Sequence, residues 1–314
     1  MRRAMLARWS RAKGHWWTIR PQLSERIRPV TAPSGCAWET GLRDPSVGSV
    51  RLRGQLREEP LSSTLLVVVH GLGGDPQSRY CRRAARGAAV RGWSCLRMGM
   101  RGSTGDGEDL YHAGLDSDLA HVLRDPSLAH YDRVMVLGYS LGGHLTLRHA
   151  LGPDDRVTAV AAISAPLDLR RSCDAIDQRG AWLYRVHVLR ALKQGYRQIA
   201  ERRDVPTPPA EVERVRFLRD WDRLTVVPRF GFDDVEDYYR RASVGPRLHD
   251  LQVPSLYVGM RHDPMVIRST VEPSLAAATS APRLELRWLG EGGHVAAPGS
   301  WEDDALDWLD RQRR

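Results

Sequence analysis

The stretch Gly138-Tyr139-Ser140-Leu141-Gly142 decides the fold of this chain of 314 residues. The residues before it, 133–137 (RVMVL), are apolar and β-branched, which predicts a buried parallel strand. The residues after it, 143–151 (GHLTLRHAL), predict a helix of about two to three turns. A serine between a strand and a helix, with a glycine two residues to either side, is the G-x-S-x-G nucleophile elbow. Gly138 and Gly142 are needed because a Cβ at either position would collide with the neighbouring strand and helix.

An acid and a histidine follow Ser140 in the chain order that such a site requires. The apolar strand 253–260 (VPSLYVGM) leads into Asp263, and the alternating strand 284–289 (LELRWL) leads into a glycine-rich loop that carries His294. Both loops leave the carboxyl ends of strands, on the side of the sheet expected for Ser140. His294 Nε2 would take the hydroxyl proton of Ser140, and Asp263 would hold the histidine tautomer. The sequence therefore predicts a triad of Ser140, Asp263 and His294.

Other acids and histidines compete for these roles. Asp168 is the alternative acid, because it follows the apolar strand 157–163 and some hydrolases carry their acid at that position. His144, on the helix after the elbow, is interpreted as structural, as is His149. His262, beside the predicted acid, is interpreted as a loop residue.

The loop after the most apolar strand is the predicted oxyanion hole. Strand 65–69 (LLVVV) leads into 70–74 (HGLGG), whose glycines let the backbone approach a substrate closely. We expect the backbone amides of Leu72 and Leu141 to hold the oxyanion, and His70 to bond to backbone and organise the turn. The chain has neither G-x-G-x-x-G nor G-K-[ST] at this loop, so a phosphate role is not expected. No cofactor and no metal are predicted.

Several sequence blocks resemble one known family, the YheT/EstC-type α/β-hydrolases, which are bacterial relatives of the eukaryotic ABHD1/3-like proteins. The resemblance spans residues 14–309 and rests on the order and spacing of the blocks 14–18 (GHWWT), 70–74 (HGLGG), 78–80 (SRY), 100–102 (MRG), 110–114 (LYHAG), 138–144 (GYSLGGH), 165–169 (APLDL), 237–239 (DYY) and 292–294 (GGH). The chain departs from the family at His144, where Asn is frequent, and at His262, where a second acid is frequent. Neither departure touches the triad. The resemblance implies acyl-ester chemistry, because family members hydrolyse esters, acylglycerols or phospholipids and some yeast relatives transfer acyl groups to alcohols.

The order of the expected elements predicts an α/β fold. A hairpin of strands at 38–40 and 49–56, turned at Asp44-Pro45, opens the fold, and strands then alternate with helices. We expect an α/β-hydrolase fold: a mostly parallel eight-stranded sheet, helices on both faces, and a helical cap inserted after strand 6.

Three parts of the chain are expected. Residues 1–36 form an N-terminal arm, residues 37–169 and 244–314 form the core, and residues 170–243 form the cap or lid. The cap is charged and helical, and its aromatic residues are expected to help line the acyl pocket: Trp182, Tyr184, Trp221, Phe230, Phe232, Tyr238 and Tyr239.

Composition sets limits on partners and compartment. The hydrophobic content of 42% can supply a large core, and the net charge of +9 comes almost wholly from arginine spread along the chain. That spread indicates a solvated surface, so nucleic-acid binding is not expected. The four cysteines show no paired or zinc-type spacing, which predicts free thiols in the cytoplasm.

The N-terminal arm is basic and rich in tryptophan. It lacks the apolar region of a signal peptide, and the chain has no apolar run long enough for a transmembrane helix. Its arginines, together with Trp9, Trp16 and Trp17, allow weak peripheral contact with an anionic membrane face. The interpretation that we favour is an arm packed on the body of the protein.

The function predicted from these residues is a cofactor-free serine hydrolase. It would cleave short- to medium-chain acyl esters or acylglycerols, as small-molecule or lipid substrates, through an acyl-enzyme on Ser140. The alternative is an acyltransferase with the same triad, in which an alcohol replaces water. A non-catalytic binding protein is a third hypothesis, and the intact triad argues against it. Serine at the elbow also argues against dehalogenase and epoxide hydrolase chemistry, which use aspartate there.

Overall fold

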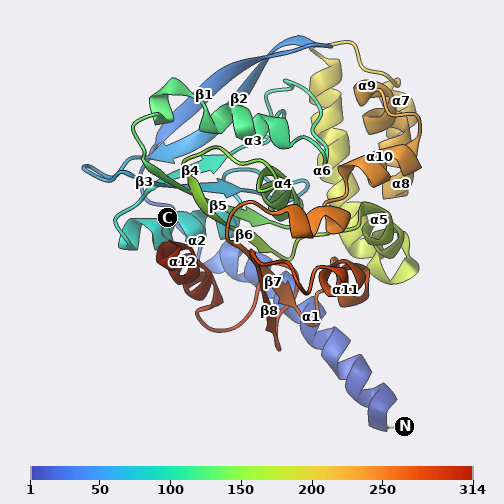
Figure 1. The fold of residues 1–314 in the computed structure, drawn as a ribbon. Helices are drawn as coiled ribbons and strands as arrows, with labels where there is room; N and C mark the ends of the chain where they lie inside the picture. The colour runs from blue at the N-terminus through green and yellow to red at the C-terminus, as the bar shows by residue number, and fades with distance from the viewer. Residues whose placement is uncertain (1, 313–314) are drawn as a thin grey trace.

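The structure, a computed structural model that describes residues 2–312, is built around one eight-stranded sheet (Figure 1). The strand order is β1-β2-β4-β3-β5-β6-β7-β8. The pairs β1–β2 and β2–β4 are antiparallel, and every other pair is parallel. The strands are β1 (Cys36–Asp44), β2 (Gly48–Arg57), β3 (Thr64–Val69), β4 (Ser94–Met98), β5 (Arg133–Tyr139), β6 (Val157–Ile163), β7 (Ser255–Met260) and β8 (Leu284–Leu289). The predicted α/β-hydrolase topology is confirmed.

The opening hairpin is longer than its sequence pattern indicates. Its strands pair from Cys36 opposite Leu56 to Asp44 opposite Gly48, well beyond the short first strand expected at 38–40. The turn follows Asp44, whose Oδ1 accepts the backbone N–H of Ser46 at 2.9 Å and that of Val47 at 3.2 Å. The first strand was underestimated because its side chains are mostly exposed, so no apolar run marks its ends.

Helices cover both faces of the sheet because alternate strand residues point to opposite sides. Leu65, Val67 and Val69 of β3 belong to the core beneath α3 (Asp116–Leu123), α4 (Leu141–His149) and α11 (Arg268–Ala277). Leu66 and Val68 belong to the core beneath α2 (Arg79–Val90) and α12 (Trp301–Arg311). The parallel strands are thus buried on both faces, which explains their near-continuous apolar runs.

Between β6 and β7 the chain is helical. These elements are α5 (Leu169–Asp177), α6 (Trp182–Ala200), α7 (Pro209–Val212), α8 (Leu218–Trp221), the π-helical turn η3 (Asp222–Val226), α9 (Val227–Phe230) and α10 (Val235–Ala242). The short 3₁₀ helix η4 (Gly245–Asp250) then leads into β7. The division of the chain into arm, core and cap remains a prediction.

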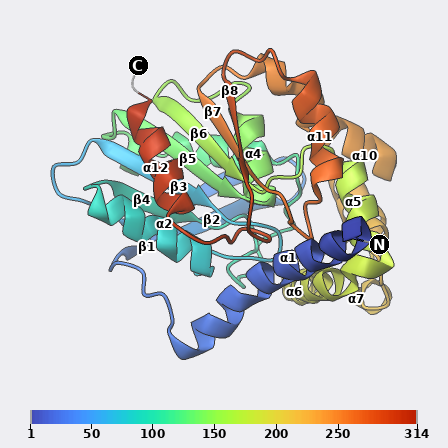
Figure 2. The ribbon, with the colours of Figure 1, turned by 90° about the horizontal axis from the view of Figure 1, so that it is seen from below.

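The N-terminal segment forms one long helix, α1 (Arg2–Ile27), which contacts the first turn of α6 through His15 (Figure 2). The ring of His15 stacks on that of Tyr184 with 5.6 Å between ring centroids, and its Nδ1 lies 2.6 Å from the tyrosine hydroxyl. Across residues 2–312, no helix is both long enough and apolar enough to span a bilayer.

Candidate functional site

Ser140 sits at the sharp turn between β5 and α4. Its backbone is left-handed, with φ 52° and ψ −119°, which is strained for a residue that carries a Cβ. A Cβ on Gly138 would overlap the carbonyl of Gly142, and a Cβ on Gly142 would overlap the carbonyls of Val69 and His70. Close backbone approach therefore leaves no room for a side chain at either elbow glycine.

Asp263 and His294 come from the loops after β7 and β8, and they are joined by a hydrogen bond. The Nδ1 of His294 lies 2.9 Å from Oδ2 of Asp263. The other oxygen of Asp263 accepts the backbone N–H groups of Met265 at 2.8 Å and Val266 at 2.9 Å, which fixes the carboxylate. Both side chains are buried. Because Nδ1 faces an acceptor, the neutral imidazole carries its proton there and leaves Nε2 free to accept another.

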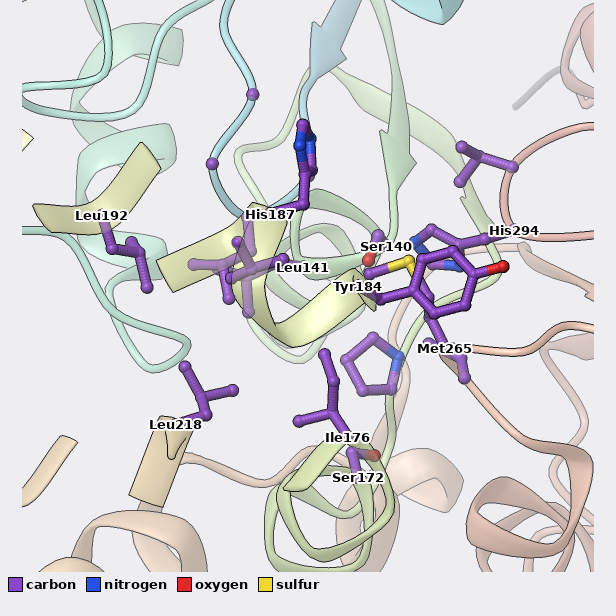
Figure 3. A pocket seen from close by; sticks show the side chains of 18 of the residues that line it. Ser140, Leu141, Ser172, Ile176, Tyr184, His187, Leu192, Leu218, Met265 and His294 are labelled. Atoms are coloured by element: carbon purple, nitrogen blue, oxygen red, sulfur yellow. The ribbon is translucent and has the colours of Figure 1, made fainter. Parts of the chain in front are cut away.

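Ser140 and His294 line the same cavity. Figure 3 shows their side chains beside one another at one end of this cavity, with Tyr184 and Met265 close by. Three segments far apart in the chain thus bring a hydroxyl, an imidazole and a carboxylate to one edge of the sheet. Such a set can transfer a proton from the hydroxyl to the imidazole.

The loop at residues 70–74 lies directly against the elbow. A Cβ on Gly71 would come within 3.0 Å of the Ser140 Cβ. Two tyrosines hold the loop: the Tyr80 hydroxyl accepts the N–H of Gly71 at 3.0 Å, and the Tyr111 hydroxyl accepts that of Gly73 at 2.8 Å.

The amides of Leu72 and Leu141 remain available beside this loop. Both residues line the cavity, and neither backbone N–H donates to an acceptor within residues 2–312. Free amides next to a nucleophile can stabilise a developing oxyanion.

His70 is a structural residue of this loop. Its Nε2 accepts the backbone N–H of Met100 at 3.1 Å, and its Nδ1 lies 2.8 Å from the carbonyl oxygen of Gly71. Burial lowers the pKa of His70 to about 4. A neutral imidazole held on both sides organises the turn, as the sequence predicts.

The competing acid and histidine are engaged elsewhere. Asp168 caps α5, where its carboxylate accepts the backbone N–H of Arg171 at 3.0 Å. The ring nitrogens of His144 lie 2.7 Å from the carbonyl oxygen of Pro166 and 2.9 Å from that of Ala242, and burial lowers the pKa of His144 to about 4. Neither side chain is hydrogen-bonded to Ser140, Asp263 or His294.

The cavity above Ser140 has a volume of about 670 Å³ and mostly apolar walls. Of the aromatic residues expected to line it, Tyr184, Trp221, Tyr238 and Tyr239 do so. Trp182, Phe230 and Phe232 do not: Trp182 is half-exposed, Phe230 packs on His112 and Phe232 on Tyr238. Aromatic composition alone does not distinguish a pocket wall from the packing behind it.

Two features of the site were missed by sequence reasoning. The first is Thr18 of α1, whose Oγ1 accepts the backbone N–H of His294 at 2.8 Å. The second is the buried carboxylate of Asp222 in the cavity wall, which accepts the hydroxyl of Tyr239 at 2.7 Å. Burial raises the pKa of Asp222 to about 7. Thr18 ends the block 14–18 noted above, but nothing local in the sequence indicates its partner.

Comparisons with known sequences agree with this geometry. The family model described as "alpha/beta hydrolase fold" matches residues 64–297. "Putative esterase YheT" of Escherichia coli (strain K12) is 30% identical, over 78% of this chain and 76% of its own length. "Monoacylglycerol lipase" of Saccharomyces cerevisiae (strain ATCC 204508 / S288c) is 24% identical over 74% of this chain, which spans 54% of that protein.

A comparison with solved structures shows the same fold. The esterase Pf2001 of Pyrococcus furiosus superposes with a TM-score of 0.55 at 17% sequence identity, covering 88% of this chain and 91% of the esterase. At that identity the likeness concerns the fold alone.

Proposed function

Because this chain belongs to the α/β-hydrolase fold family and to its esterase and lipase type, we propose that it is a serine hydrolase that cleaves carboxylic esters on Ser140, Asp263 and His294. The observation that carries the proposal is the 2.9 Å hydrogen bond between His294 and Asp263, in a cavity that also contains Ser140 at a strained elbow. This is the arrangement that converts a neutral hydroxyl into a nucleophile.

The reaction follows from the positions of these groups. Ser140 Oγ attacks the acyl carbon while His294 Nε2 takes its proton, and Asp263 stabilises the resulting imidazolium. The amides of Leu72 and Leu141 hold the oxyanion, and the N-terminus of α4 adds a favourable dipole. His294 then gives the proton to the leaving alcohol. Water, activated by the same histidine, releases the acid from the acyl-enzyme.

The cavity supports short- to medium-chain acyl esters or acylglycerols as substrates. A volume of about 670 Å³ with apolar walls accommodates an acyl chain and its alcohol. The name of the yeast relative, a monoacylglycerol lipase, points to the same class. We propose that residues 170–243 act as the cap whose helices close this cavity over the core.

The direct test is Ser140→Ala, assayed with p-nitrophenyl butyrate and with a fluorophosphonate probe. We expect loss of ester turnover by at least about a thousandfold and loss of labelling. Thermal unfolding of the variant serves as the folding control. Turnover at the wild-type rate would reject the proposal, and so would labelling that persists in the variant.

The alternative is transfer of the acyl group to an alcohol on the same residues. The apolar cavity walls favour it, since they disfavour bulk water near the acyl-enzyme. Added ethanol would then divert the product from butyric acid to ethyl butyrate, measured by gas chromatography. If the ratio of ethyl butyrate to butyric acid only follows the ratio of ethanol to water, the enzyme has no preference for the alcohol and is a hydrolase.

We also propose a cytoplasmic enzyme that contacts a membrane peripherally through the N-terminal arm, residues 1–36. The four free cysteines support a reducing compartment, and three of them are buried. The half-exposed Trp16 of α1 supports membrane contact, because tryptophan favours the headgroup region.

A further inference from the structure

Large apolar side chains that are exposed are concentrated on two helices of the described chain. Trp16, Ile19, Leu23 and Ile27 belong to α1, and Trp182, Leu183 and Val186 belong to α6; we call this set the mouth face. Their exposed fractions run from 38% to 80%. Exposed apolar residues are common singly, but a group of them on neighbouring elements indicates an interaction site.

On α1 these residues form a stripe opposite the packed side of the helix. The spacing 16, 19, 23 and 27 places them on one helical face. Gly14, Thr18 and Glu25 lie on the other face, where Gly14 packs on the His262 carbonyl, Thr18 bonds to His294, and Glu25 pairs with Arg79 and Arg82 of α2. The inner face of α1 is therefore engaged, whereas the residues of the apolar stripe are exposed.

On α6 the exposed residues occupy the first turns. Trp182 and Val186 are one helical turn apart, and Leu183 lies next to them. The contact between His15 and Tyr184 joins the first turn of α6 to α1. The two groups of apolar side chains thus belong to adjoining helices.

The mouth face borders the catalytic cavity. Ile19 of α1 and Leu183 of α6 both line the cavity that holds Ser140, and both are exposed. A surface that covered the mouth face would therefore also cover the entrance to the cavity.

The charge around the mouth face is positive. Arg20 and Arg190 are exposed, and they follow Trp16 and Val186, respectively, by one helical turn. The one acidic residue of these two helices is Glu25, which is neutralised by Arg79 and Arg82.

We propose that the mouth face docks on the surface of an anionic phospholipid bilayer and that ester substrates enter the cavity from the lipid. Apolar side chains flanked by arginines suit the headgroup boundary, where the chains are buried and the cations meet phosphate. The entry of substrate from the lipid rests on the proposed ester hydrolysis and specifies the source of its substrate. Binding itself does not require that reaction.

Binding is measured by co-sedimentation of the full chain, in the Ser140→Ala form, with two kinds of vesicle. One contains phosphatidylglycerol and phosphatidylcholine in equal parts, and the other contains phosphatidylcholine alone. We expect preferential binding to the anionic vesicles, weakened at least about tenfold when NaCl is raised to about 0.5 M. If the protein does not bind the anionic vesicles, the docking proposal is rejected. If the wild-type protein binds them but does not hydrolyse esters, only the proposed function is rejected.

Trp16→Ser and Trp182→Ser test the two helices separately, and neither tryptophan lines the cavity. Each is expected to weaken vesicle binding by about tenfold, and to slow hydrolysis of an ester embedded in vesicles without changing that of soluble p-nitrophenyl butyrate. The matched controls are Leu61→Ser and Val90→Ser, which remove exposed apolar side chains outside the mouth face. Equal binding by all four variants would reject the assignment. Sedimentation velocity tests one further outcome. If the wild-type chain is a dimer and Trp182→Ser is a monomer, the mouth face binds a second copy of the chain instead of a membrane.

Discussion

The backbone N–H of His294 donates a hydrogen bond to Oγ1 of Thr18 at 2.8 Å, across 276 positions of sequence. The Thr18 hydroxyl in turn donates to the carbonyl of Gly14 one helical turn earlier, at 2.9 Å. The N-terminal helix therefore holds the loop that carries the proposed catalytic histidine. The acid loop is held as well, because Gly14 leaves no room for a Cβ beside the carbonyl of His262.

Thr18→Ala removes the acceptor for the His294 amide, and we expect it to lower kcat about tenfold with little change in KM. One lost hydrogen bond at a buried group is worth about 1–1.5 kcal/mol, which matches that factor. Thr18 acts as a positioning residue, so Thr18→Ser should recover most of the lost rate. Steady-state kinetics with p-nitrophenyl butyrate measure both. Thr18→Ser as slow as Thr18→Ala would contradict the role of the hydroxyl.

Gly293→Ala tests the packing between the same two segments. A Cβ at Gly293 would come within 2.7 Å of the Thr18 backbone nitrogen and would overlap the Gly14 carbonyl, so helix and loop must separate. We expect kcat to fall at least tenfold, because small displacements of a catalytic group are costly. Gly290→Ala is the control in the same loop, since nothing lies within 4 Å of a Cβ there. Equal activities of the two variants would show that this packing does not position His294.

Asp263→Asn should lower kcat by about a thousandfold or more while the protein stays folded. The carboxylate of Asp263 accepts from His294 Nδ1, whereas an amide nitrogen in its place would donate and favour the wrong tautomer. Asp168→Asn is the matched control, because asparagine also caps a helix well and Asp168 contacts Arg171 rather than His294. An Asp168→Asn variant that loses activity to the same extent would return the acid role to Asp168.

Asp222→Asn should stabilise the protein more at pH 8 than at pH 5. Burial, with the nearby Asp177 adding to it, raises the pKa of Asp222 to about 7 from an ordinary value of 3.8. The folded state then holds this proton more tightly than the unfolded state, so this group's contribution to stability is lost as pH rises from about 4 through 7. Asparagine keeps an acceptor for the Tyr239 hydroxyl and carries no charge, so the gain at pH 8 should exceed that at pH 5 by about 2 kcal/mol.

Thermal unfolding at both pH values measures this difference. Asp220→Asn is the control, because its side chain is half-exposed and it lies two residues earlier in the chain. Glu302, whose pKa burial raises to about 7, titrates in the same range, so variant and wild type are compared at each pH. A gain of equal size at pH 5 and pH 8 would contradict burial of a charge at Asp222.

Most of the fold was predictable because its signals are local. The strand predicted at 133–137 appears as Arg133–Tyr139, and the helix predicted at 143–151 appears as Leu141–His149. Buried parallel strands are apolar throughout, and glycine is required where two backbones approach closely. Both features can therefore be recognised from a few consecutive residues. The residues that line the cavity could not be identified from local sequence. Trp182 and Trp221 are both tryptophans of the same helical segment, but only Trp221 lines the cavity.

The sequence by itself determined the parallel sheet, the elbow and the order of Ser140, Asp263 and His294, because periodicity and glycine spacing act over a few residues. Only the tertiary structure decided which partners complete the site: Thr18 against His294, Tyr80 and Tyr111 against the loop at 70–74, and Asp222 in the cavity wall. It also decided that Ile19 of α1 and Leu183 of α6, which are both exposed, line the same cavity. These are contacts between segments far apart in the chain, and their geometry depends on how whole helices pack rather than on any neighbouring residue.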